Sequence, residues 1–122
     1  RKRSATVSAV PAVMIASMPA GGRTLAVFAM LKDKDIGGVV GAVQAHISDW
    51  LVADTESARG ACAEMLAAQL AHAGVRAPVA QFSDVATAWR AACESAADND
   101  KIIVFGSFLT VAAVMRERLR RV

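Results

Sequence analysis

Residues 23–31, RTLAVFAML, decide the fold class, because they form a continuous apolar run directly after a Gly-Gly pair. A short run of this kind predicts a strand that is buried on both faces, as in a parallel sheet. Residues 32–35 follow as a polar loop, and apolar residues then recur at helical spacing over 36–47, with Asp35 as the expected N-cap. The segment therefore predicts a buried strand that leads through a short loop into a helix.

The same strand-to-helix pattern recurs along the rest of the chain. Further strands are expected at 49–53, 78–82 and 101–105, and further helices at 59–73, 84–97 and 109–121, while 9–18 could form a first helix. Short connections between alternating strands and helices predict an α/β fold with a Rossmann-like, doubly wound and mostly parallel sheet. Helices are expected on both faces of that sheet.

Composition and charge exclude several classes of protein. With 122 residues, 55% of them hydrophobic, the chain is long enough for one domain with a core and too apolar to be disordered. No apolar run approaches the roughly 18 residues that a membrane-spanning helix requires. The net charge of +3 comes from clusters at the two ends, Arg1, Lys2, Arg3, Arg116, Arg118, Arg120 and Arg121. The body between them is acidic, so neither nucleic acid nor a membrane is expected as a partner.

The side chains that most often bind metals or act as nucleophiles form no recognisable constellation. Cys62 and Cys93 lack metal or redox spacing and are expected as free thiols, which favours a reducing cytoplasm. His46 and His72 have no partner at ligand spacing, so no metal site is expected. No catalytic triad or Cys/His pair can be assembled.

Two loops are candidate ligand sites, because parallel sheets bind ligands at the carboxyl ends of their strands. These loops are residues 31–35 and 106–110, each after a strongly apolar strand. Lys34, next to a helix start, could bind an anion or be an ordinary solvated charge. Ser107 could donate its hydroxyl to a ligand or cap the following helix. The nearby glycines form neither of the common phosphate-binding motifs.

The same loops carry a family resemblance. Residues 23–36, RTLAVFAMLKDKDI, resemble the "AVxGMLxDKDI" segment of bacterial dihydrofolate synthase/folylpolyglutamate synthase, in the Mur ligase superfamily. Three more segments are similar in order and spacing: 49–53 to "DxWYxA", 59–64 to "RGAxAExL" and 104–111 to "VxGSFHTV". The resemblance covers about residues 19–118.

The resemblance implies the C-terminal domain of an ATP-dependent ligase of folate biosynthesis and one-carbon metabolism. Such an enzyme uses ATP and Mg²⁺ to convert a carboxylate into an acyl phosphate, which the amine of L-glutamate attacks to give dihydrofolate or folate polyglutamates. The phosphate loop and the magnesium ligands belong to a preceding larger domain. The C-terminal domain closes over the site and contributes to glutamate and nucleotide binding.

By this resemblance, Lys34 would approach a glutamate carboxylate and Ser107 would hydrogen-bond the same amino acid, with Asp33 and Thr110 as adjacent candidates. No catalytic residue and no metal ligand is expected in this chain. The implied partners are L-glutamate, folate or dihydropteroate, and ATP, reached through the missing domain. The isolated chain is expected to be an inactive, cytoplasmic monomer that holds neither ATP nor Mg²⁺ tightly.

Three departures from the family pattern stand out. The family's "DxAHNP" motif is missing near residues 1–11, Leu109 replaces the usual His, and no phosphate loop is present. Residues 1–18 are therefore expected as a divergent N-terminal segment, either foreign to the native protein or a helix. Residues 19–122 are expected as the Mur-ligase-type C-terminal domain.

Other classes of protein remain open as alternatives. A free-standing α/β binding or receiver-like module would use Asp33 and Asp35 after the first strand, and Asp54 as phosphate acceptor. A receiver also needs a Lys after a later strand, whereas the last strand here runs into Gly106. A degenerate paralogue that acts through protein contacts is a third interpretation.

Overall fold

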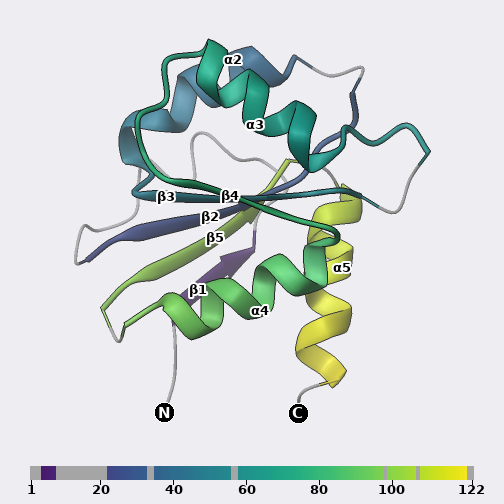
Figure 1. Ribbon diagram of the computed structural model, residues 1–122. Coiled ribbons are helices and arrows are strands. Elements are labelled where there is room, and N and C mark those ends of the chain that lie inside the picture. Colours follow the sequence, from purple (N-terminus) through teal and green to yellow (C-terminus); the bar gives the residue numbers. More distant parts are fainter. Residues whose placement is uncertain are drawn as a thin grey trace.

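A computed structural model describes residues 4–7, 22–32, 35–55, 58–97, 99–106 and 108–120 (Figure 1). Its elements are β1 (Ser4–Val7), β2 (Thr24–Phe28), α2 (Ile36–Val43), a 3-10 turn (Gln44–His46), β3 (Asp49–Ala53), α3 (Ala63–His72), β4 (Val79–Phe82), α4 (Val85–Ser95), β5 (Lys101–Phe105) and α5 (Phe108–Arg120). Within these residues the strands form one sheet in the order β1-β5-β2-β3-β4, and every pairing is parallel. The predicted α/β fold with a parallel sheet is confirmed.

Helices cover both faces of the sheet, as predicted. Figure 1 shows α2 and α3 on one face and α4 and α5 on the other. Successive side chains of a strand point to opposite faces, so each central strand supplies both cores. In β2, for example, Phe28 packs in the core under α2 and α3, whereas Val27 packs in the core against α4 and α5. This two-sided burial is why β2 and β5 read as continuous apolar runs.

The order of the strands creates a reversal between β2 and β5. From β2 the chain moves outward through α2, β3 and α3 to the edge strand β4, and α4 then returns it across the other face to β5. The loop after β2 therefore leads to a helix on one face, and the loop after β5 leads to a helix on the opposite face. A crevice at such a reversal, outside the carboxyl ends of the strands, is the usual ligand site of open α/β sheets.

Some elements differ from the sequence-based expectation. Strand β1 was not predicted; it pairs with β5 from Ser4↔Lys101 to Val7↔Val104. Helix α3 begins at Ala63 rather than at residue 59, because the residues before it pair with the loop after β2. The helix that could form at 9–18 lies outside the described residues.

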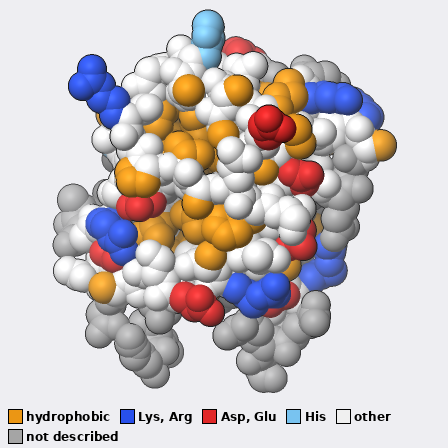
Figure 2. Space-filling view, viewed as in Figure 1, with side chains coloured by type: hydrophobic (Ala, Val, Ile, Leu, Met, Phe, Trp, Pro, Cys, Tyr) orange, Lys and Arg blue, Asp and Glu red, His pale blue; other side chains and the backbone are white. Residues whose placement is uncertain are grey.

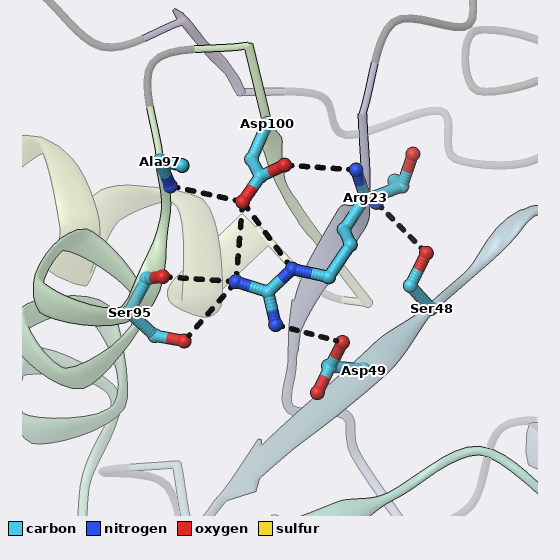
Figure 3. Close-up of polar contacts among 7 residues, drawn as sticks. Arg23, Ser48, Asp49, Ser95, Ala97 and Asp100 are labelled. Carbon is cyan, nitrogen blue, oxygen red and sulfur yellow. Dashed lines mark hydrogen bonds and ion pairs between the residues drawn. The ribbon is translucent and has the colours of Figure 1, made fainter.

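A polar cluster joins four elements at the amino edge of the sheet (Figure 3). The nearly buried carboxylate of Asp100 accepts hydrogen bonds from the backbone N–H groups of Arg23 (2.9 Å) and Ala97 (2.9 Å) and from the Arg23 guanidinium (3.1 and 3.3 Å). The same guanidinium donates to the Ser95 carbonyl (2.9 Å) and to Asp49 (3.4 Å). We call these residues the Arg23–Asp100 latch; they connect the starts of β2, β3 and β5 to the end of α4.

The latch predicts a pH dependence of folding stability. The backbone N–H groups of Ala97 and Arg23, with help from the Arg23 guanidinium, hold the pKa of Asp100 below its usual value. A lowered pKa in the folded state stabilises the fold above the unfolded-state pKa, about 3.9, and this contribution is lost as the pH falls through the folded-state pKa. We expect the urea midpoint to fall below about pH 4. Asp100→Asn should lower the midpoint at neutral pH and flatten its acid dependence; an unchanged acid dependence would contradict this assignment.

Candidate functional site

The loops after β2 and β5 are in direct contact at the carboxyl edge of the sheet. Gly106 ends β5 with φ +125°, a conformation that L side chains rarely adopt. A Cβ atom on Gly106 would overlap the carbonyl group of Ala29, coming within 2.9 Å of its carbon, and would lie 3.2 Å from Cδ1 of Phe28. Glycine is therefore required here, because the backbone that leaves β2 passes directly against it.

Thr110 makes a second connection between the same loops. It lies in the first turn of α5, its side chain is fully buried, and its Oγ1 donates a hydrogen bond to the Ala29 carbonyl (2.7 Å). This bond gives a partner to a backbone carbonyl just beyond the end of β2. The start of α5 is thereby fixed against the end of β2.

A short backbone ribbon holds the β2 loop from the opposite side. Leu31 and Gly60 form an antiparallel bridge. The N–H of Ala61 donates to the Met30 carbonyl (2.9 Å), and the N–H of Lys32 donates to the Arg59 carbonyl (2.9 Å). The segment 59–61, which resembles a family motif, therefore supports the loop after β2 through its backbone.

Aspartate carboxylates accept backbone hydrogen bonds at the starts of α2 and α3. Asp35 accepts from the N–H of Gly38 (3.0 Å) at the start of α2, which confirms the predicted N-cap. Asp54 accepts from the N–H of Ala63 (2.6 Å) at the start of α3. The residue considered as a phosphate acceptor in the receiver-like alternative therefore stabilises a helix start in this fold.

Three aromatic rings from β2, β3 and β5 pack together in the core under α2 and α3, and we call them the aromatic floor. Phe28 packs against Phe105 with ring centroids 4.9 Å apart and against Trp50 at 5.6 Å, in an edge-on arrangement. All three side chains are essentially fully buried. Edge-on and tilted pairs of this kind add to the stabilisation from burial alone.

The structure locates the predicted site residues only in part. Thr110 is described, whereas Lys34, Asp33 and Ser107 lie outside the described residues. Their neighbours in the chain are described. Lys32 is exposed and comes directly before residues 33–34, and Gly106 comes directly before residue 107. The supporting contacts of Ala29 and of residues 59–61 were missed by sequence reasoning, although the "RGAxAExL" resemblance marked the latter segment.

Elsewhere in the described part of the chain, a pocket lies at the surface near β4 and α4. Figure 2 shows hydrophobic side chains at the surface between β4 and α4, where a pocket of about 280 Å³ is lined by residues such as Leu51, Phe82 and Ala91. Its polar members, Asp49 and Ser95, both contact Arg23.

The described residues hold no group of three or more His, Cys, Asp or Glu side chains suited to a metal ion. Of the helices that the structure describes, none is long and apolar enough to cross a bilayer.

Comparisons with known proteins relate the chain to one family. Residues 5–108 match the Mur ligase, glutamate ligase domain family. The dihydrofolate synthase/folylpolyglutamate synthase of Escherichia coli (strain K12) is 42% identical over 99 residues, which cover 81% of this chain and 22% of that protein.

Comparison with solved structures points to the same family. A structure of E. coli FolC in complex with DHPP and ADP superposes with a TM-score of 0.79 and 41% identity, over 90% of this chain and 25% of that chain. A bifunctional folylpolyglutamate synthase/dihydrofolate synthase with Mn, AMPPNP and L-glutamate bound gives a TM-score of 0.72 and 45% identity, over 80% of this chain and 23% of that one. The chain thus spans about a quarter of the structures it resembles. It belongs to the Mur ligase glutamate ligase domain family and is homologous to the C-terminal domain of dihydrofolate synthase/folylpolyglutamate synthase.

Proposed function

We infer that this chain is the glutamate-binding and nucleotide-closing domain of an ATP-dependent ligase that adds L-glutamate to dihydropteroate or to folates through an acyl phosphate. The observation that carries the proposal is the meeting of the β2 and β5 loops at the reversal of the sheet, joined by the Thr110–Ala29 hydrogen bond. The similar structure with bound L-glutamate supports glutamate as the ligand. The names of the curated relatives support a folate as the acceptor.

Within this proposal, Lys34 and Ser107 bind the glutamate. A lysine can pair with either carboxylate of the amino acid, and a serine hydroxyl can donate a charge-assisted hydrogen bond to the same anion. Asp33 is adjacent to Lys34, and Thr110 supports the loop of Ser107. None of these residues is assigned a catalytic role.

ATP and Mg²⁺ are assigned to the remainder of a full-length enzyme. The similar structure with Mn and AMPPNP supports a nucleotide and a divalent metal for such an enzyme. The described part of this chain does not fit a metal ion, since its acidic side chains form no suitable group. We propose that the isolated chain catalyses neither ATP hydrolysis nor ligation, because its sequence contains no phosphate loop. We also propose that the full-length enzyme is a cytoplasmic monomer.

Titration of the chain with L-glutamate tests the assignment of Lys34 and Ser107. We expect Lys34→Ala and Ser107→Ala each to weaken binding about tenfold, because each removes one charge-assisted contact. Lys32→Ala is the matched control for charge, since Lys32 is exposed in the same loop. Ser83→Ala is the matched control for a hydroxyl, since Ser83 is exposed after β4.

The two control variants distinguish specific glutamate binding from a general attraction between the chain and an anion. Binding that Lys34→Ala and Lys32→Ala weaken equally would indicate only a general attraction between a basic loop and an anion. Binding that neither Lys34→Ala nor Ser107→Ala reduces would show that glutamate is held elsewhere.

A further inference from the structure

We propose that Thr110 is a positioning residue that fixes the distance between the two site loops through the Ala29 carbonyl and does not itself bind the ligand. Its side chain is fully buried. A hydroxyl has a single hydrogen to donate, and Oγ1 of Thr110 donates it to Ala29 over 2.7 Å. Hydrogen donation from the Thr110 hydroxyl to an anionic substrate is therefore excluded while this bond exists.

The bond connects segments that are far apart in the sequence. Thr110 and Ala29 are 81 positions apart, and they belong to the two strand ends at which the sheet reverses direction. The first turn of α5 follows the β5 loop, and Ala29 begins the β2 loop, so this contact sets how closely the loops approach. Gly106 provides the necessary space, because any side chain there would displace the same carbonyl.

On the opposite side, the structure describes backbone contacts that hold the β2 loop. The Leu31–Gly60 bridge and its neighbouring hydrogen bonds connect residues 30–32 to residues 59–61. Substitutions other than those to proline leave these backbone donors and acceptors in place. Removal of the Thr110 hydroxyl should therefore release one support of the loop while this backbone bridge stays in place.

Hydrogen–deuterium exchange of the 122-residue chain tests the proposal. Thr110→Val keeps the shape of the side chain but removes the hydroxyl and leaves a buried carbonyl without this donor. We expect amide exchange in segments 29–32 and 106–110 to rise about tenfold, with α3 and β4 unchanged. Thr110→Ser keeps the hydroxyl and loses a methyl group, so exchange in these segments should stay close to that of the wild type.

A second variant separates the positioning role from a general loosening of α5. Glu117 is buried farther along α5 and accepts a hydrogen bond from Arg90 of α4 (2.8 Å). Glu117→Gln weakens this contact between α4 and α5 without touching Ala29, so exchange at 29–32 should not change. Uniformly faster exchange in Thr110→Val, or equal local effects of the valine and serine variants, would overturn the proposal.

Glutamate titration adds a functional readout that rests on the proposed function. If Lys34 and Ser107 bind glutamate, Thr110→Val should weaken binding about fivefold to tenfold and Thr110→Ser should restore it. Wild-type affinity in Thr110→Val would overturn the positioning role. A wild-type chain that binds no glutamate would contradict the proposed function instead, while the exchange experiment would still decide the role of Thr110.

Discussion

Gly106→Ala should lower the free energy of unfolding by about 3 kcal/mol or more, because two penalties coincide at this position. The backbone angle φ of +125° is costly for any residue with a Cβ atom. In addition, the new methyl group would overlap the Ala29 carbonyl, and a backbone group cannot move aside by changing a rotamer. Urea unfolding, followed by the fluorescence of the buried Trp50 and Trp89, measures the loss.

Gly74 and Gly41 distinguish the cost of the positive φ from the cost of the overlap with Ala29. Gly74 also has a positive φ, +88°, but nothing lies within 4 Å of an added Cβ, so Gly74→Ala should cost only about 1 kcal/mol. Gly41 lies within α2, is exposed and has open space around it, so Gly41→Ala should stabilise the fold by about 0.5–1 kcal/mol. Equal losses at Gly106 and Gly74 would show that the overlap with Ala29 contributes nothing.

Phe28→Ala should destabilise the protein by about 4 kcal/mol, as expected for the loss of a large side chain from a packed core. Phe28 is fully buried and contacts both of the other rings in the aromatic floor. Small domains have a total stability of about 5–15 kcal/mol, so this loss is a large share of the whole. The urea midpoint and the near-ultraviolet circular dichroism of the aromatic residues should both fall.

Phe82 provides the matched control. It is only half-buried, in the edge strand β4, and Phe82→Ala removes a side chain of the same size. The loss of stability should therefore be clearly smaller than for Phe28→Ala. Similar losses would contradict the larger stabilisation assigned here to the fully buried Phe28 and its ring contacts.

The fold could be predicted where local sequence carries the physical signal. Buried strands such as β2 and β5 are continuous apolar runs, and the cap of α2 is marked by Asp35. Strand β1 was missed because the four residues SATV have no such run, and its pairing with β5 depends on residues near the other end of the chain.

The sequence allowed the candidate site to be assigned to two loops, but it did not reveal the contacts between those loops. The positions of the β2 and β5 loops follow from the strand pattern, and the resemblance selected residues within them. The contact from Thr110 to Ala29 spans 81 positions, and the partner of Thr110 is a carbonyl that every residue type possesses. No local pattern marks such a partner, so sequence reasoning placed Thr110 next to the ligand without its supporting role.

The Arg23–Asp100 latch has a further consequence for how charge changes act on this protein. It lies at the amino edge, and the five residues of β2 place it roughly 16 Å from the carboxyl edge. That separation is about twice the screening length of roughly 8 Å at physiological ionic strength. Substitutions that change the charge of the Arg23–Asp100 latch should therefore alter the melting temperature. They should not change the attraction of an anion to the carboxyl edge of the sheet. We therefore expect that thermostability and the proposed affinity for an anionic ligand can be adjusted separately in this domain.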